Sequence, residues 1–219
     1  MSKNVIYLVD GHTLPKDHGT ESFFDKKNYP LTEAELIRKV NQVVIDNFYN
    51  NFDAADYELK HINNDNTTSD YALSEKIRKI NDDRPNYKTD IAIECHFNAH
   101  KDPKVSGWLI IIGKNNKLGE AFRKAETIEE IKNKGIYTPT KYYSESRNKS
   151  RYKIKLLSRD LGFISKVNIS SAIIENCFCS SPEDMKWLYS NLDKNIEQLA
   201  YIIINGIKNF YTVKEDVDA

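Results

Sequence analysis

Residues 90–97 read DIAIECHF, an almost continuous apolar run that carries a histidine near its end. Runs of this length and character are typical of strands buried on both faces, as in a parallel sheet. Similar apolar runs lie at residues 5–9 and 172–174, and a histidine or a glutamate follows each within a few positions. We therefore predict a buried sheet whose strands end at polar groups.

Segments of helical spacing separate these strands. Apolar residues recur every three or four positions over residues 33–49 and again over 73–80, where Pro85 ends the pattern. Further strands are predicted at 57–62, 108–112 and 163–164, further helices at 117–133 and 182–210, and loops at 13–31 and 134–160. Strands that alternate with helices indicate an α/β fold, with a central, mostly parallel twisted sheet flanked by helices.

The composition indicates one ordinary globular domain. The 219 residues suffice for a single core, which we place at residues 1–212, with a polar C-terminal tail at 213–219. Lys plus Arg and Asp plus Glu both number 32, so no basic excess indicates nucleic acid as a partner. A monomer is the expected state.

The cysteines and the N-terminus bear on the compartment. Cys95, Cys177 and Cys179 are odd in number and lack a framework spacing, which favours reduced thiols. Cys177 and Cys179 also lack the second pair that a structural zinc site needs. We find neither a signal peptide nor an apolar stretch that could span a membrane, so we expect synthesis in the cytoplasm without a transmembrane segment.

Four reactive side chains lie at predicted element ends. His12 and His96 stand at strand ends, Glu175 follows the run SAII, and Glu33 opens the first long helix. Sites in α/β sheets form beyond the carboxyl ends of strands, so these side chains should share one rim. Two histidines and a carboxylate, with a fourth position open to water, are the ligand set of a catalytic zinc ion.

The choice of Glu33 rests on helix capping. Thr32 and Glu35 have the spacing of a capping box, which gives Glu35 a structural role and leaves Glu33 free for a metal. Glu35 and Glu21 remain as alternatives for this ligand.

Several stretches together resemble a known family, the zinc-dependent N-acetylmuramoyl-L-alanine amidases of autolysins and phage endolysins. The similar stretches, in chain order, are IYLVDGHTLPKDHGT (6–20), TEAELIRKV (32–40), IRKIND (77–82), DIAIECHFNAH (90–100) and SAIIENCFCSSPEDM (171–185). The chain departs from the family pattern after His12, where Thr13 and Leu14 replace a glycine pair, and in the Tyr-, Lys- and Arg-rich segment 134–160.

The resemblance implies a site and a reaction. It implies that His12, Glu33 and His96 hold one Zn²⁺ and that Glu175 is the catalytic carboxylate. The implied reaction uses zinc-activated water to cleave the amide between the muramic acid lactyl group and L-Ala in peptidoglycan. Asn98, Arg147 and Arg151 are candidate substrate-binding residues, and a solvated surface is the alternative for the two arginines.

Three functions therefore stay open. The first is a phage endolysin or autolysin catalytic domain that reaches the cell wall after release from the cytoplasm. A second is a zinc carboxypeptidase or endopeptidase that acts on the stem peptide of peptidoglycan. The third is an inactive wall-binding protein, which retention of all four site residues disfavours.

Overall fold

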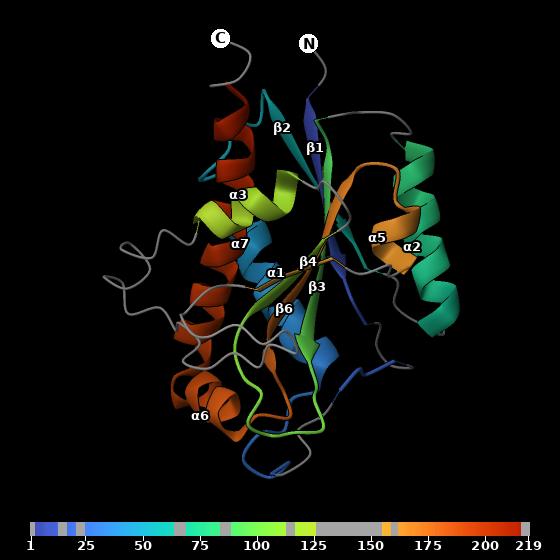
Figure 1. The fold of residues 1–219 in the computed structure, drawn as a ribbon. Helices are drawn as coiled ribbons and strands as arrows, with labels where there is room; N and C mark the ends of the chain where they lie inside the picture. Colours follow the sequence, from blue (N-terminus) through green and yellow to red (C-terminus); the bar gives the residue numbers. More distant parts are fainter. Residues whose placement is uncertain are drawn as a thin grey trace.

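Six strands form a single sheet in the computed structural model (Figure 1). They are β1 (Asn4–Asp10), β2 (Tyr57–Ile62), β3 (Ile91–Asn98), β4 (Leu109–Ile112), β5 (Lys155–Ser158) and β6 (Ser170–Phe178), in the spatial order β2-β1-β3-β6-β4-β5. The first four strands in this order run parallel, β4 pairs antiparallel with β6, and β5 runs parallel to β4. The predicted α/β fold with a mostly parallel sheet is confirmed.

The structure describes residues 3–12, 17–20, 25–63, 69–83, 89–112, 117–125, 155–158 and 162–215. The predictions for residues 126–133 of the third helix and for most of the 134–160 loop lie outside these ranges.

Helices cover both faces of the sheet, which gives three layers (Figure 1). One face carries α1 (Glu33–Phe48), α3 (Lys117–Ala125), α6 (Pro182–Ser190) and α7 (Leu192–Glu215); the other carries α2 (Ser69–Asp83) and α5 (Gly162–Lys166). Leu8 packs into the first of these layers and Tyr7 into the second, and both are almost fully buried. This burial on two faces explains why the central strands have continuous apolar sequences.

Two element predictions are wrong. Residues 163–164 belong to the short helix α5 instead of a strand, because an isolated apolar pair cannot distinguish the two. The helix predicted at 182–210 is broken at Asn191, whose φ of −158° and ψ of 82° are not helical. The side chain of Asn195 donates to the carbonyl oxygens of Trp187 and Leu188, which satisfies acceptors at the end of α6.

Two further boundaries differ from the prediction. The segment predicted as a loop at 134–160 ends in strand β5, which pairs with β4 at the edge of the sheet. Helix α7 continues to Glu215, past the predicted end at residue 210. Buried Phe210 and Tyr211 hold this last part of α7 against the core.

None of the described helices combines the length and the apolar character that a membrane span requires.

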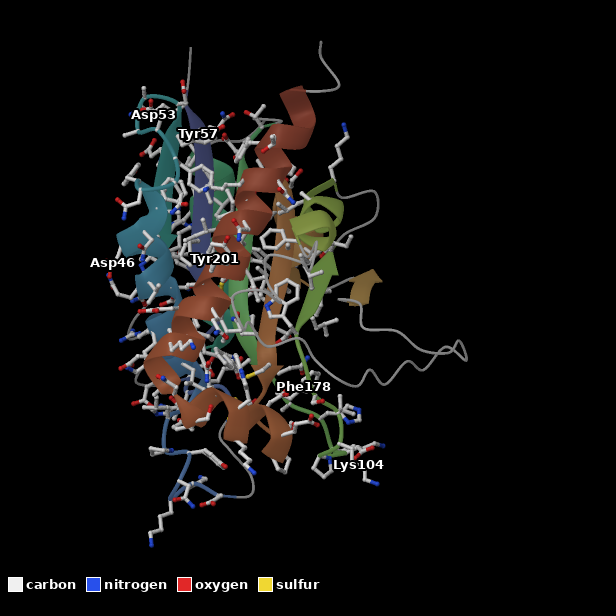
Figure 2. All side chains as sticks on the ribbon, turned by 90° about the vertical axis from the view of Figure 1, so that its left-hand side faces the viewer. Asp46, Asp53, Tyr57, Lys104, Phe178 and Tyr201 are labelled. Atoms are coloured by element: carbon white, nitrogen blue, oxygen red, sulfur yellow. The ribbon has the colours of Figure 1, made fainter. Side chains whose placement is uncertain are left out.

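The two ends of the sheet differ in what they carry. Figure 2 shows Phe178, at the carboxyl end of β6, and Lys104, in the loop after β3, at one end, with Asp53 and Tyr57 at the other. Because β1, β3 and β6 are parallel, their carboxyl ends meet at the Phe178 end. His12 follows β1, His96 lies in β3 and Glu175 lies in β6, so these three predicted site residues gather at that end.

Helix α3 packs closely on α7 through a glycine. A Cβ atom at Gly206 would overlap the ring of Phe122, which is itself buried. The missing side chain therefore sets how near the two helices can lie.

Gly206→Ala should lower the free energy of unfolding by about 1–3 kcal/mol, because the added methyl group overpacks the contact with Phe122. Helix propensity alone predicts the opposite change, a free energy of unfolding that is higher by about 1 kcal/mol. Denaturant unfolding, with Asn205→Ala as the control on the same helix turn, distinguishes the two. A stabilised Gly206→Ala variant would show that the two helices do not pack as described.

Candidate metal centre

The two histidines lie on neighbouring strands. His12 follows β1 by two residues, and His96 lies near the end of β3, which pairs with β1. The backbone N–H of Gly11 donates to the carbonyl oxygen of Cys95 at 2.9 Å, which ties the turn before His12 to β3. A Cβ atom at Gly11 would overlap the His96 ring, so a residue without a side chain is needed between the two imidazoles.

Glu33 reaches the same place from the first turn of α1. The predicted capping box is present, since Thr32 caps α1 and the Glu35 side chain accepts from the Thr32 backbone N–H at 2.8 Å. Glu35 is thereby engaged in capping, while the alternative Glu21 lies outside the described residues. The backbone N–H of Thr20 donates to Glu33 Oε2 at 2.7 Å and that of Phe97 to Oε1 at 3.0 Å, which fixes the carboxylate.

The loop before α1 approaches the site through Gly19. Its φ of 65° lies in the left-handed region that favours glycine, and a Cβ atom there would overlap both Glu33 and His12. Gly19 therefore allows the backbone to pass directly beside the candidate ligands.

The distances among the three candidate ligands fit one metal ion. Glu33 Oε1 lies 3.2 Å from His12 Nε2 and 3.1 Å from His96 Nδ1, and one ligand atom from each residue lies within 4.8 Å of the others. Ligand atoms about 2.0–2.1 Å from a tetrahedral zinc ion are roughly 3.3 Å apart. The structure thus brings together His12, Glu33 and His96 at spacings that a zinc ion could bridge.

The electrostatics of the cluster favour positive charge at its centre. Burial raises the pKa of the Glu33 carboxyl, but hydrogen bonds with His12 and His96 outweigh burial and hold it well below its usual range. Burial lowers the pKa of both imidazoles, but contacts with Glu33 leave both above their usual range. A divalent cation would supply the same positive charge and displace the protons.

Each imidazole has a carboxylate at its other ring nitrogen. Asp17 Oδ2 lies 2.9 Å from His12 Nδ1, and Glu94 Oε2 lies 3.5 Å from His96 Nε2. Buried Lys76 lies 3.6 Å from Glu94. Carboxylates in this position orient metal-binding histidines.

Asp17, Glu94 and Lys76 were not predicted as site residues from the sequence, although Glu94 and Lys76 carried a signal. Glu94 is a charged residue inside a buried strand, and Lys76 lies on the apolar face of α2, between Leu73 and Ile77. A charge at such a position needs a partner. Arg78, in the stretch that resembles the family, is instead exposed and pairs with Glu75 and Asp82.

Glu175 lies directly beside His96. The two are paired residues of the parallel strands β6 and β3. Burial, opposed by the charge of His96, raises the pKa of the Glu175 carboxyl to about 7. Its Oε2 atom is buried and makes no hydrogen bond within the described residues. A carboxyl group with a free oxygen and a pKa near 7 is suited to accept and return a proton at neutral pH.

The remaining candidates divide into described and undescribed residues. The side-chain oxygen of Asn98 accepts a hydrogen bond from the backbone N–H of Ala99. The backbone carbonyl oxygen of Asn98 accepts one from the N–H of Cys179 at 2.8 Å. Cys95, Cys177 and Cys179 are buried free thiols. Arg147 and Arg151 lie outside the described residues.

A mostly parallel sheet with a His–Glu–His cluster and a buried carboxyl group beside it is an arrangement suited to metal-dependent hydrolysis. Residues 6–209 match the family model described as N-acetylmuramoyl-L-alanine amidase, and the chain belongs to this family. The resemblance inferred from the sequence motifs is confirmed. The search of curated proteins gave no match.

Solved structures of amidases share the fold. An N-acetylmuramoyl-L-alanine amidase from Clostridium difficile 630 has a TM-score of 0.70 at 15% identity, covering 96% of this chain and 97% of that one. The catalytic domain of the amidase CwlV from Bacillus (Paenibacillus) polymyxa has a TM-score of 0.69 at 13% identity, covering 96% and 99%. The catalytic domain of the CD27L endolysin, which targets Clostridia difficile, has a TM-score of 0.63 at 18% identity, covering 94% and 97%.

The ligand set can be tested by metal binding. His96→Ala and Glu33→Gln should each weaken zinc binding by at least about 100-fold, because a lost ligand costs more than the 10- to 100-fold typical of an outer contact. Competition with a chromophoric chelator measures the affinity, and exposed His100→Ala is the control. Unchanged zinc binding in both ligand variants would refute the assignment.

The raised pKa of Glu175 predicts a pH-dependent stability. The unfolded carboxyl group ionises near pH 4.5, whereas the folded one keeps its proton to about pH 7. The metal-free chain therefore loses stability as pH rises between these values, by at most about 3 kcal/mol. Glu175→Gln removes this loss.

In thermal unfolding with a chelator present, Glu175→Gln should be more stable than the native chain at pH 8, and the difference should shrink toward pH 5. Exposed Glu197→Gln, on α7, is the matched control and should show no such trend. A difference independent of pH would contradict the raised pKa.

Proposed function

We propose that this chain hydrolyses the amide bond between the lactyl group of N-acetylmuramic acid and L-Ala in peptidoglycan, with one Zn²⁺ as its cofactor. The observation that carries the proposal is the juxtaposition of His12, Glu33 and His96 in a chain of the amidase family. The ion would polarise the scissile carbonyl group and lower the pKa of a water molecule to about 7.

Contacts with neighbouring groups would orient each of the three proposed ligands toward the ion. The imidazoles present Nε2 of His12 and Nδ1 of His96 toward Glu33, and their other nitrogens face Asp17 and Glu94. Backbone N–H groups hold both oxygens of Glu33. These contacts fix the donors before the metal binds, which lowers the ordering cost of binding.

Glu175 would act as the general base and then as the general acid. As a carboxylate it takes a proton from the attacking water, and as a carboxylic acid it returns this proton to the nitrogen of the leaving L-Ala. Two observations support this role: Glu175 lies beside His96, and its Oε2 atom has no hydrogen-bond partner in the described part of the chain.

Asn98, Arg147 and Arg151 remain the proposed substrate-binding residues. Asn98 lies at the carboxyl end of β3, two residues beyond His96, so it borders the site. The arginines would contact acidic groups of the stem peptide. The action of the chain on the cell wall, after release by phage lysis or another route, is part of the same proposal.

The proposed base predicts a separation of binding from catalysis. Glu175→Gln should keep zinc at one ion per chain but lower the rate of hydrolysis by about 100-fold or more, because general acid–base catalysis contributes about 10²–10⁴-fold. The measurement is the appearance of new N-terminal L-Ala on purified peptidoglycan, with Glu197→Gln as the control.

The same digest distinguishes the alternative functions. Release of D-Ala without new N-terminal L-Ala would favour a carboxypeptidase, and binding of the wall without any cleavage would favour an inactive binding protein. Native rates in Glu175→Gln would exclude this residue as the base.

A further inference from the structure

We infer that Lys76 is a positioning residue that holds the two histidine-bearing segments in register for the metal. The inference rests on the proposed zinc site and concerns how the chain builds that site. Lys76 lies on α2, and its side chain is only 1% exposed. Its ammonium group contacts Asp10 and Gly11 at the end of β1 and Glu94 in β3.

The contacts to β1 are made with the backbone. The ammonium group donates to the carbonyl oxygen of Gly11 at 2.8 Å and also to that of Asp10. Asp10 is the last residue of β1, and Gly11 follows it directly before His12. A strong donor to both carbonyl groups fixes the orientation of the peptide units from which the His12 side chain emerges.

The contact to β3 is made through Glu94. Lys76 Nζ lies 3.6 Å from Glu94 Oε1, and Glu94 Oε2 lies 3.5 Å from His96 Nε2. Glu94 is 4% exposed at its side chain, so without Lys76 its charge would be buried and uncompensated apart from His96. One ammonium group therefore stabilises the backbone before His12 and the carboxylate behind His96.

A purely electrostatic role predicts the opposite effect on zinc binding. Lys76 has the same sign of charge as the ion, so its removal would leave Glu94 unbalanced and would strengthen the binding of a cation. If Lys76 acts by positioning, its removal weakens binding, because the imidazoles lose their fixed orientation. The sign of the change therefore separates the two roles.

Lys76→Met keeps the length and the apolar stem of the side chain and removes only the charge. We expect the zinc affinity of this variant to fall by about 10- to 100-fold, the range of outer contacts of a metal site. Lys79→Met, the same substitution at an exposed position of α2, should bind zinc as the native chain does. Affinity is measured by competition with a chelator, and the visible spectrum of bound Co²⁺ reports the ligand geometry.

The double variant Lys76→Met/Glu94→Gln provides a second test that leaves the net charge unchanged. It contains no uncompensated buried charge, so it should fold even if Lys76→Met does not. Because Glu94 itself contacts His96, the double variant is compared with Glu94→Gln alone. Electrostatics predicts that adding Lys76→Met to Glu94→Gln strengthens zinc binding, whereas positioning predicts a further loss and an altered Co²⁺ spectrum. Thermal unfolding in chelator verifies that each variant is folded.

Unchanged or tighter zinc binding in Lys76→Met, or binding in the double variant no weaker than in Glu94→Gln alone, would overturn the inference. The native chain is assayed in parallel for zinc binding and for release of N-terminal L-Ala. Failure of the native chain to bind zinc would instead overturn the proposed function, and this inference with it. Native zinc binding and hydrolysis together with unaffected variants would overturn only the role of Lys76.

Discussion

The site depends on one buried carboxylate that contacts two imidazoles. Glu33 Oε1 lies 3.2 Å from His12 and 3.1 Å from His96, and the Glu33 side chain is only 3% exposed. A carboxylate at this depth is costly unless cations and hydrogen-bond donors surround it. The first turn of α1 supplies part of this compensation, since the N-terminus of a helix favours negative charge. The two imidazoles and the backbone N–H groups of Thr20 and Phe97 supply the rest, and a divalent cation would add to it.

The fold meets this constraint by bringing backbone unusually close to the cluster. Gly11 and Gly19 stand where any Cβ atom would overlap a candidate ligand. Farther out, Asp184 accepts from the backbone N–H groups of Gly107 and Phe178, both at 2.8 Å, and so links the end of β6 to the segment before β4. A buried carboxylate therefore holds the segment before β4 against the end of β6.

The sequence predicted those parts of the site that local pattern controls. Apolar runs located β1, β3 and β6, and the capping box, which the structure contains, favoured Glu33 over Glu35 as the candidate ligand. The break at Asn191 escaped prediction because it depends on Asn195 bonding back to α6, a tertiary arrangement. Lys76 and Glu94 escaped for the same reason, since each is an anomaly in the sequence that only the contact between α2 and β3 explains.

The balance of buried charge gives these residues different roles. Glu94 forms an ion pair with Lys76, and Glu33 contacts two imidazoles. In contrast, the Oε2 atom of Glu175 has no hydrogen-bond partner within the described residues. Burial therefore keeps Glu175 protonated up to about pH 7. Paired carboxylates can hold a structure or a cation, whereas an unpaired one is free to exchange a proton. In the proposed mechanism, binding of the metal and transfer of the proton would thus fall to different glutamates because their partners differ, although the residue type is the same.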